Sequence, residues 1–153
     1  MSDPITFDTT TPRFHLPLLF AGQAQKEFFV NEGRHLTDAL LHCAIESQTA
    51  TPPATPSDGQ AWLVAAGANG VWTGQGGNLA CRQSGQWLFI VPRDGMRIVN
   101  KASGQDLRWL SGSWITPTVP AAPTGGTIID SQARSAIADI VQRLREAGIF
   151  AAT

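Results

Sequence analysis

The stretch Gly59-Gln60-Ala61-Trp62-Leu63-Val64 recurs in outline as Gly85-Gln86-Trp87-Leu88-Phe89-Ile90 and as Gly112-Ser113-Trp114-Ile115. In each copy a turn glycine and a polar residue precede an indole and a run of β-forming apolar residues. The glycines lie 26 and 27 residues apart, which is long enough for a hairpin and its connection. A tryptophan is large and has one polar atom, so it either fills a core or forms a flat recognition surface. The repeat therefore predicts a β-sheet region. Whether its tryptophans are buried or exposed decides whether this region is only a scaffold or also a binding surface.

Around this repeat the sequence alternates short apolar segments with glycine turns. Ser84-Gly85 and Asp94-Gly95 are favourable hairpin turns, because glycine accepts a positive φ at little cost. The short connections predict an antiparallel meander or sandwich over residues 59–116. Its expected strands are 61–65, 71–73, 79–82, 87–92, 96–100, 107–110 and 113–115.

Three segments precede the β region. Residues 1–22 carry prolines at positions 4, 12 and 17, which predict an extended arm. This arm either covers the edge of its own domain or reaches a neighbouring subunit. Residues 23–50 predict a helix followed by a short strand, because apolar residues recur at three- and four-residue steps up to Cys43. Residues 51–58 form a proline-rich connector.

The C-terminal part predicts a linker and an isolated helix. Residues 117–129 are rich in proline and glycine, whereas 130–149 have an N-cap at Asp130 or Ser131 and a C-terminal glycine, Gly148. The apolar positions of this helix form a heptad seam, and isoleucine at both seam positions favours three or more strands. Packing against its own sheet is the alternative. The seam residues taken as oligomerisation candidates are Ile137, Ile140 and Leu144.

Together these segments predict an α+β fold, in which a small antiparallel meander or sandwich is flanked by an N-terminal helix and a C-terminal coiled-coil-like helix. Only 15% of the 153 residues are charged and the net charge is −1, which argues against nucleic acid as a partner. The stretch 59–116 is mildly basic at +3, which favours a solvated sheet face over an anion-binding patch. The N-terminus has no pattern of a signal peptide, and no apolar run is long enough for membrane insertion.

The residues that enzymes use are sparse. No nucleophile elbow or phosphate-binding glycine loop is present, and the histidines His15, His35 and His42 lack metal-ligand spacing, so we expect no metal and no cofactor. Asp94 and Asp106 are the only acids of the β region, and both fall in turns. We therefore expect no enzymatic activity, with a cell-wall hydrolase accessory domain as the weakest alternative. The cysteines Cys43 and Cys81 are expected to be buried free thiols rather than a disulfide.

The tryptophans divide into two expected groups. Trp62 and Trp87 lie inside apolar runs and are expected in the core. The others lie near turns and polar residues, where indole faces and neighbouring donors suit a sugar or a protein interface. The glycan or interface candidates are Trp72, Trp109, Trp114, Arg108 and Gln105.

The order of motifs in the chain resembles a phage-associated domain family of unassigned function. The residues that carry the resemblance are Thr11-Pro12-Arg13-Phe14, Gly22-Gln23-Ala24-Gln25-Lys26-Glu27, Trp62-Leu63-Val64, Gly70-Val71-Trp72-Thr73-Gly74, Gly85-Gln86-Trp87 and Pro92-Arg93-Asp94-Gly95-Met96. That family occurs in tail-fibre and spike proteins of tailed phages and gene transfer agents. One departure stands out, because Cys81-Arg82 replaces an expected polar or aromatic pair. We also expect the domain to act without a long receptor-binding extension.

The resemblance implies a structural or adhesion component of a virion or gene-transfer-agent particle. It implies a location on the particle surface, a homotrimer, contacts with other fibre, spike, capsid or tail proteins, and host surface polysaccharide as a ligand. A stand-alone carbohydrate-binding module is the alternative of a different class.

Overall fold

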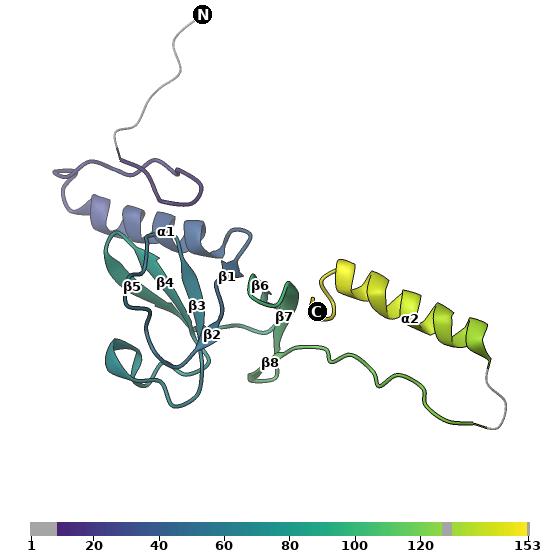
Figure 1. Ribbon diagram of the computed structural model, residues 1–153. Helices are drawn as coiled ribbons and strands as arrows, with labels where there is room; N and C mark the ends of the chain where they lie inside the picture. Colours follow the sequence, from purple (N-terminus) through teal and green to yellow (C-terminus); the bar gives the residue numbers. More distant parts are fainter. Residues whose placement is uncertain (1–8, 127–129, 153) are drawn as a thin grey trace, which may run out of the picture. The chain divides into compact units, whose positions relative to one another are not determined.

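The computed structural model describes residues 9–126 and 130–152. The chain divides into two compact units, Met1–Pro92 and Arg93–Thr153. The described parts contain two α-helices and eight strands, which confirms the α+β prediction with an N-terminal and a C-terminal helix (Figure 1). The boundary at Pro92 divides the β region predicted over 59–116 between the two units.

The first unit contains a four-stranded sheet in the order β2-β3-β4-β5. The strands are β2 (Gln48–Thr49), β3 (Ala61–Val64), β4 (Leu79–Gln83) and β5 (Gln86–Ile90). Strands β3, β4 and β5 are antiparallel neighbours, whereas β2 pairs parallel with β3. The antiparallel pairing predicted over 59–116 is therefore confirmed for β3, β4 and β5, and the parallel edge comes from β2, which precedes that range. The expected strand within 23–50 is split into β1 (Ala44–Ile45) and β2.

Helix α1 (Lys26–Leu40) crosses one end of this sheet (Figure 1). It begins three residues later than its apolar pattern predicts, because Ala24 and Gln25 both have positive φ. The arm before it is not fully extended. An antiparallel bridge joins Thr10 to Pro17, and the Thr11 N–H donates to the Leu16 carbonyl at 3.0 Å. This turn gives the arm a defined shape before it reaches the helix.

The glycine-rich segment after β3 forms a turn rather than a strand. Residues 71–73 were expected to be extended, but Gly70–Trp72 form a 3₁₀ turn, η1. Gly70 has a φ of +58°, which a β-strand does not use. The turn swings Trp72 inward, and its indole is fully buried.

The second unit contains three consecutive antiparallel strands and the second helix. The strands are β6 (Arg97–Asn100), β7 (Gln105–Leu110) and β8 (Ser113–Ile115), and the helix is α2 (Ser131–Glu146). The Asp130 carboxylate caps α2 by accepting from the Ala133 N–H at 2.9 Å. At the other end the Ile149 N–H donates to the Leu144 carbonyl at 2.9 Å, and Gly148 has a φ of +74°. Both predicted caps of the helix are thereby confirmed.

The segment after α2 is fastened beside β7. The Gly148 carbonyl accepts from the Asp106 N–H at 2.8 Å, and the Ala152 N–H donates to the Ser103 carbonyl at 2.9 Å. Phe150 is buried between these bonds. The tail that follows the helix is therefore held on the β6–β7 hairpin by backbone hydrogen bonds.

Candidate functional site

A buried carboxylate on α1 anchors the N-terminal arm of the first unit. Asp38 is fully buried. Its Oδ1 accepts from the Thr11 hydroxyl at 2.6 Å and from the Phe14 N–H at 2.7 Å, and its Oδ2 accepts from the Arg13 N–H at 3.1 Å. Three donors from one turn of the arm thus converge on one side chain of the helix. A buried charge is tolerated when hydrogen bonds satisfy it in this way.

The side chain of Arg13 completes the anchor at the C-terminal end of α1. Its guanidinium donates to the carbonyls of Asp38, Ala39, Leu41 and His42 at 2.7 to 3.2 Å. These carbonyls lack partners inside the helix, and the end of a helix favours a cation. The Thr11-Pro12-Arg13-Phe14 motif therefore has a structural role that fixes the arm to the helix.

Two opposing effects set the pKa of Asp38. Burial raises the pKa of this carboxyl group. The hydrogen bonds from Thr11, Phe14 and Arg13 lower it by more, and the Gln83 side chain also lowers it. The net result is a pKa below the usual range for an aspartic acid, so the group is ionised at neutral pH. The charge is therefore part of the folded structure of the arm.

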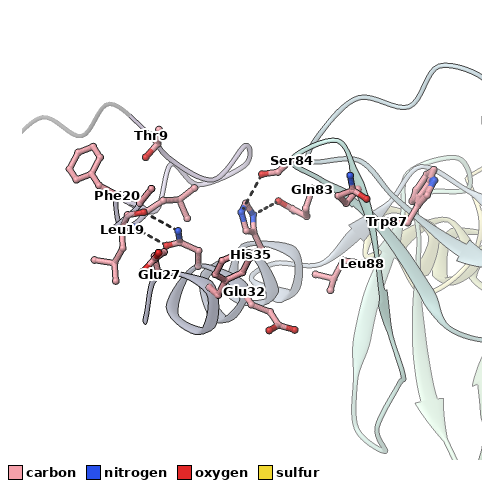
Figure 2. A pocket seen from close by; sticks show the side chains of 15 residues that line it. Thr9, Leu19, Phe20, Glu27, Glu32, His35, Gln83, Ser84, Trp87 and Leu88 are labelled. Atoms are coloured by element: carbon pink, nitrogen blue, oxygen red, sulfur yellow. Dashed lines mark hydrogen bonds between the residues drawn. The ribbon is translucent and has the colours of Figure 1, made fainter. Parts of the chain in front are cut away.

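His35 of α1 contacts two polar side chains at the β4–β5 turn. His35 Nδ1 lies 3.0 Å from Gln83 Oε1, and its Nε2 lies 3.3 Å from the Ser84 hydroxyl (Figure 2). Because an amide oxygen can only accept, Nδ1 carries the proton and Nε2 accepts from Ser84. This is the polarity of a nucleophile and its base. However, the adjacent Gly85 N–H, a possible oxyanion donor, already donates to Asp58 at 2.9 Å. These contacts of His35 with Gln83 and Ser84 hold the β4–β5 turn against α1.

Beside these side chains the first unit has a hollow with a volume of about 700 Å³. This is within the range of small-molecule and peptide sites. It lies between the arm, α1 and the β4–β5 hairpin, and its labelled side chains are drawn in Figure 2. Phe20 and Phe28 are 52% and 75% exposed, so the apolar surface is open to solvent. The apolar lining is formed by Leu18, Leu19, Phe20, Phe28, Trp87 and Leu88.

Three tryptophans of the first unit form its core. Trp62 and Trp72 are buried, and Trp87 packs against them with edge-to-face geometry and ring centroids 5.7 and 5.1 Å away. The prediction that Trp62 and Trp87 pack in the core is confirmed. The prediction of Trp72 as a ligand or interface contact is wrong, because an indole with no exposed surface offers no face for stacking.

The remaining two tryptophans form a cross-strand pair in the second unit. Trp109 on β7 lies opposite Trp114 on β8, with ring centroids 5.3 Å apart, and both are half-buried. They share the face of β7 that also carries the buried residues Gln105 and Leu107. Arg108 lies on the opposite face, since side chains alternate along a strand. The structure therefore separates Arg108 from the two indoles with which it was grouped.

Gln105 is buried and has a positioning role. Its amide nitrogen donates to the Pro117 carbonyl at 2.9 Å and to the Ile149 carbonyl at 3.1 Å. The prediction of Gln105 as a direct ligand contact is wrong, because both amide hydrogens serve the backbone. The two residues that it holds help to line a second hollow of about 240 Å³, together with Arg97, Asp106, Leu107, Arg108 and Ile115.

Helix α2 presents the predicted seam to solvent. None of its residues is buried, Ile137 and Ile140 are 44% and 58% exposed, and Leu144 is half-buried. Such exposure leaves apolar side chains of an amphipathic helix without a partner in a single chain. The alternative prediction, that the helix buries this stripe on its own sheet, is wrong for Ile137 and Ile140.

The acids and cysteines that could serve in catalysis include one turn residue, Asp94, and two buried thiols. Asp94 accepts from the Ser111 N–H at 3.0 Å and so links its own turn to the β7–β8 turn. Cys43 and Cys81 are buried free thiols, as predicted, and burial raises the pKa of Cys81 to about 12, with Cys43 adding to the shift. Within residues 9–126 and 130–152, no three His, Cys, Asp or Glu side chains gather to hold a metal ion. The described helices include none that is long and apolar enough to span a membrane.

The main residue missed at the level of sequence is Asp38. It lies in the helical pattern as one more polar position, and its partners are 24 to 27 residues earlier. The available signal was the Thr-Pro-Arg motif of the arm, whose turn gathers free backbone donors that need an acceptor.

Among known protein families, the one described as "Protein of unknown function (DUF2793)" matches residues 30–115, and no curated protein matches the chain. The matched range runs from the middle of α1 to the last residue of β8. Since it covers more than half of the chain, the protein belongs to this DUF2793 family of unknown function.

Proposed function

We propose that this protein is a non-enzymatic structural and adhesion component of a phage or gene-transfer-agent particle, assembled as a homotrimer through α2. The observation that carries the proposal is the exposed seam of Ile137 and Ile140 on a helix with no buried residue. Isolated helices of this length are marginal in water, so the seam requires a partner. Isoleucine at both seam positions favours a bundle of three or more helices.

The particle context comes from the resemblance of the ordered motifs to domains of tail-fibre and spike proteins. The anchored arm fits a structural role, because Asp38 and Arg13 use their charges to fix backbone. The apolar hollow beside the arm is where we place a second particle protein. Its exposed phenylalanines, Phe20 and Phe28, form the kind of apolar surface that marks a protein interface.

Assembly is tested on the full chain by light scattering coupled to size exclusion. We expect the mass of a trimer at micromolar concentration, and a monomer for Ile140→Asp. Ile140 is 58% exposed in the single chain, so the substitution acts on association rather than on folding. Ser135→Asp is the matched control, because it adds the same charge at an exposed position outside the seam. A wild-type chain that stays monomeric would refute the trimer.

The particle role is tested separately. An antibody to the protein should label the surface of purified particles in electron micrographs, and the protein should co-purify with them through a density gradient. Recovery of the protein only in the free fraction would contradict the role.

A further inference from the structure

Two arginines of the second unit lie opposite each other on neighbouring strands, with Asp106 two residues from one of them on the same strand face. Arg97 on β6 lies directly opposite Arg108 on β7, and Arg108 lies opposite Ile115 on β8. Directly opposed residues point to the same face of a sheet, and like charges in that position destabilise it. Within the described residues neither guanidinium takes part in a hydrogen bond or ion pair. Arg134 and Arg143 of the same unit have side-chain partners, whereas the buried Nε of Arg145 has none.

The space beside these arginines is a built hollow of about 240 Å³. Pro117 and Ile149 line it, and the buried Gln105 amide holds the carbonyls of both. The backbone bond from Asp106 to Gly148 fixes the same wall. The hollow therefore has walls at Pro117 and Ile149 that hydrogen bonds hold in place, and two exposed arginine side chains line it.

We propose that this hollow binds one carboxylate-bearing sugar unit of an acidic polysaccharide, with its carboxylate between Arg97 and Arg108. The proposal rests on the adhesion role proposed above and names its ligand class. Guanidinium groups match the planar carboxylate with paired hydrogen bonds. The apolar walls suit the C–H faces of a sugar ring, and Asp106 can accept from hydroxyl groups.

The charge of Asp106 also limits the choice of anion. Because this carboxylate lines the same hollow, it repels a dianionic phosphate ester more than a monoanionic carboxylate. A volume of about 240 Å³ is below that of sites for drug-sized molecules, so the hollow holds one unit while the polymer continues into solvent. The charged residues of the site on β7, Asp106 and Arg108, lie on the strand face opposite to the Trp109–Trp114 pair.

The test is titration calorimetry of the full chain with three polymers at low ionic strength. Polygalacturonate carries carboxylates, dextran is neutral and dextran sulfate carries sulfates. We expect polygalacturonate to bind with an affinity at least about tenfold above both others. Dextran lacks the charge for charge-assisted hydrogen bonds, and the tetrahedral sulfate of dextran sulfate fits the planar guanidinium fork less well than a carboxylate does. Equal binding of dextran would overturn the role of charge, and equal or tighter binding of dextran sulfate would overturn the carboxylate assignment.

Matched variants locate the site. Arg97→Gln and Arg108→Gln should each lower the affinity for polygalacturonate about tenfold, and Arg97→Lys should lower it in part because the planar fork is lost. Arg93→Gln is the control, since it removes the same charge from an exposed position of the same unit outside the hollow. An equal loss in Arg93→Gln would show diffuse attraction and overturn the proposal.

Light scattering measures the oligomeric state of each sample used in the titrations. The trimer and the polysaccharide site can therefore be refuted separately. A monomer that binds polygalacturonate with the expected arginine dependence supports the site and refutes the trimer. A trimer that binds none of the polymers refutes the site and leaves the assembly intact.

Discussion

Replacing Asp38 with asparagine should detach the N-terminal arm from α1. Asparagine retains one oxygen, which can keep the bonds from the Thr11 hydroxyl and the Phe14 N–H. Its amide nitrogen takes the place of Oδ2, which accepts from the Arg13 N–H at 3.1 Å in the wild type. Two donors then face each other and this hydrogen bond is lost. The variant loses a charge-assisted hydrogen bond and gains a buried unsatisfied donor, which together cost about 2–4 kcal/mol.

For a chain of this length, that cost corresponds to a fall in Tm of about 5–15 °C, from roughly 2–4 °C per kcal/mol. Thermal unfolding followed by circular dichroism measures it. The control is Asp139→Asn, which changes the same side chain at an exposed position of α2. Limited proteolysis should cut the variant first between residues 9 and 22. A Tm within 1 °C of wild type would refute the reasoning.

The pH dependence provides a second check. The pKa of Asp38 in the folded protein is lowered, so its charge contributes stability that is complete above the unfolded pKa of about 3.9. That contribution is lost as the pH falls through the lower, folded pKa. The difference in unfolding free energy between wild type and Asp38→Asn should therefore be constant from pH 7 to 5 and narrow below about pH 4. A difference that grows on acidification would contradict the assignment.

Three further predictions concern buried groups. Trp72→Ala should destabilise the protein by about 3–5 kcal/mol in urea unfolding, whereas Trp72→Phe should cost far less, because the buried Nε1 has no hydrogen-bond partner to lose. Equal losses would contradict this. At pH 8 only about one in ten thousand Cys81 side chains is a thiolate, given a pKa of about 12, so a thiol reagent should label it only after unfolding; rapid labelling of the native protein would refute the burial. Gln105→Ala should cost about 1–3 kcal/mol and speed hydrogen exchange in residues 148–152, and unchanged exchange would show that the amide does not hold this tail.

Local patterns predicted the regular elements well. The caps of α2 follow from Asp130 and Gly148 because capping depends on residues within a few positions of the helix end. Strands β4 and β5 follow from their apolar runs on either side of the Ser84-Gly85 turn. These features need no information about distant parts of the chain.

Contacts between distant residues could not be predicted in the same way. The glycines and polar residues around Trp72 make it a glycan or interface candidate in the sequence, yet Gly70 forms the turn that points its indole inward. Arg108 and Trp109 are adjacent in the sequence, but alternation along β7 puts them on opposite faces. The candidate glycan site thereby moves from the indoles to the arginine face. The partner of Arg108 there, Arg97, is recognisable only from the strand register.

The family match and the proposed assembly concern different parts of the chain. The matched residues 30–115 end with β8, so α2 lies outside them, and so do the arm residues Thr11 and Arg13. Residues 30–115 do include Asp38, Arg97 and Arg108. The proposed trimerisation through α2 therefore depends on residues outside the matched range, and the hollow likewise needs Pro117 and Ile149 from outside it. A chain that ends after β8 should accordingly lose both the trimer and the anion site, while Arg97 and Arg108 remain in place.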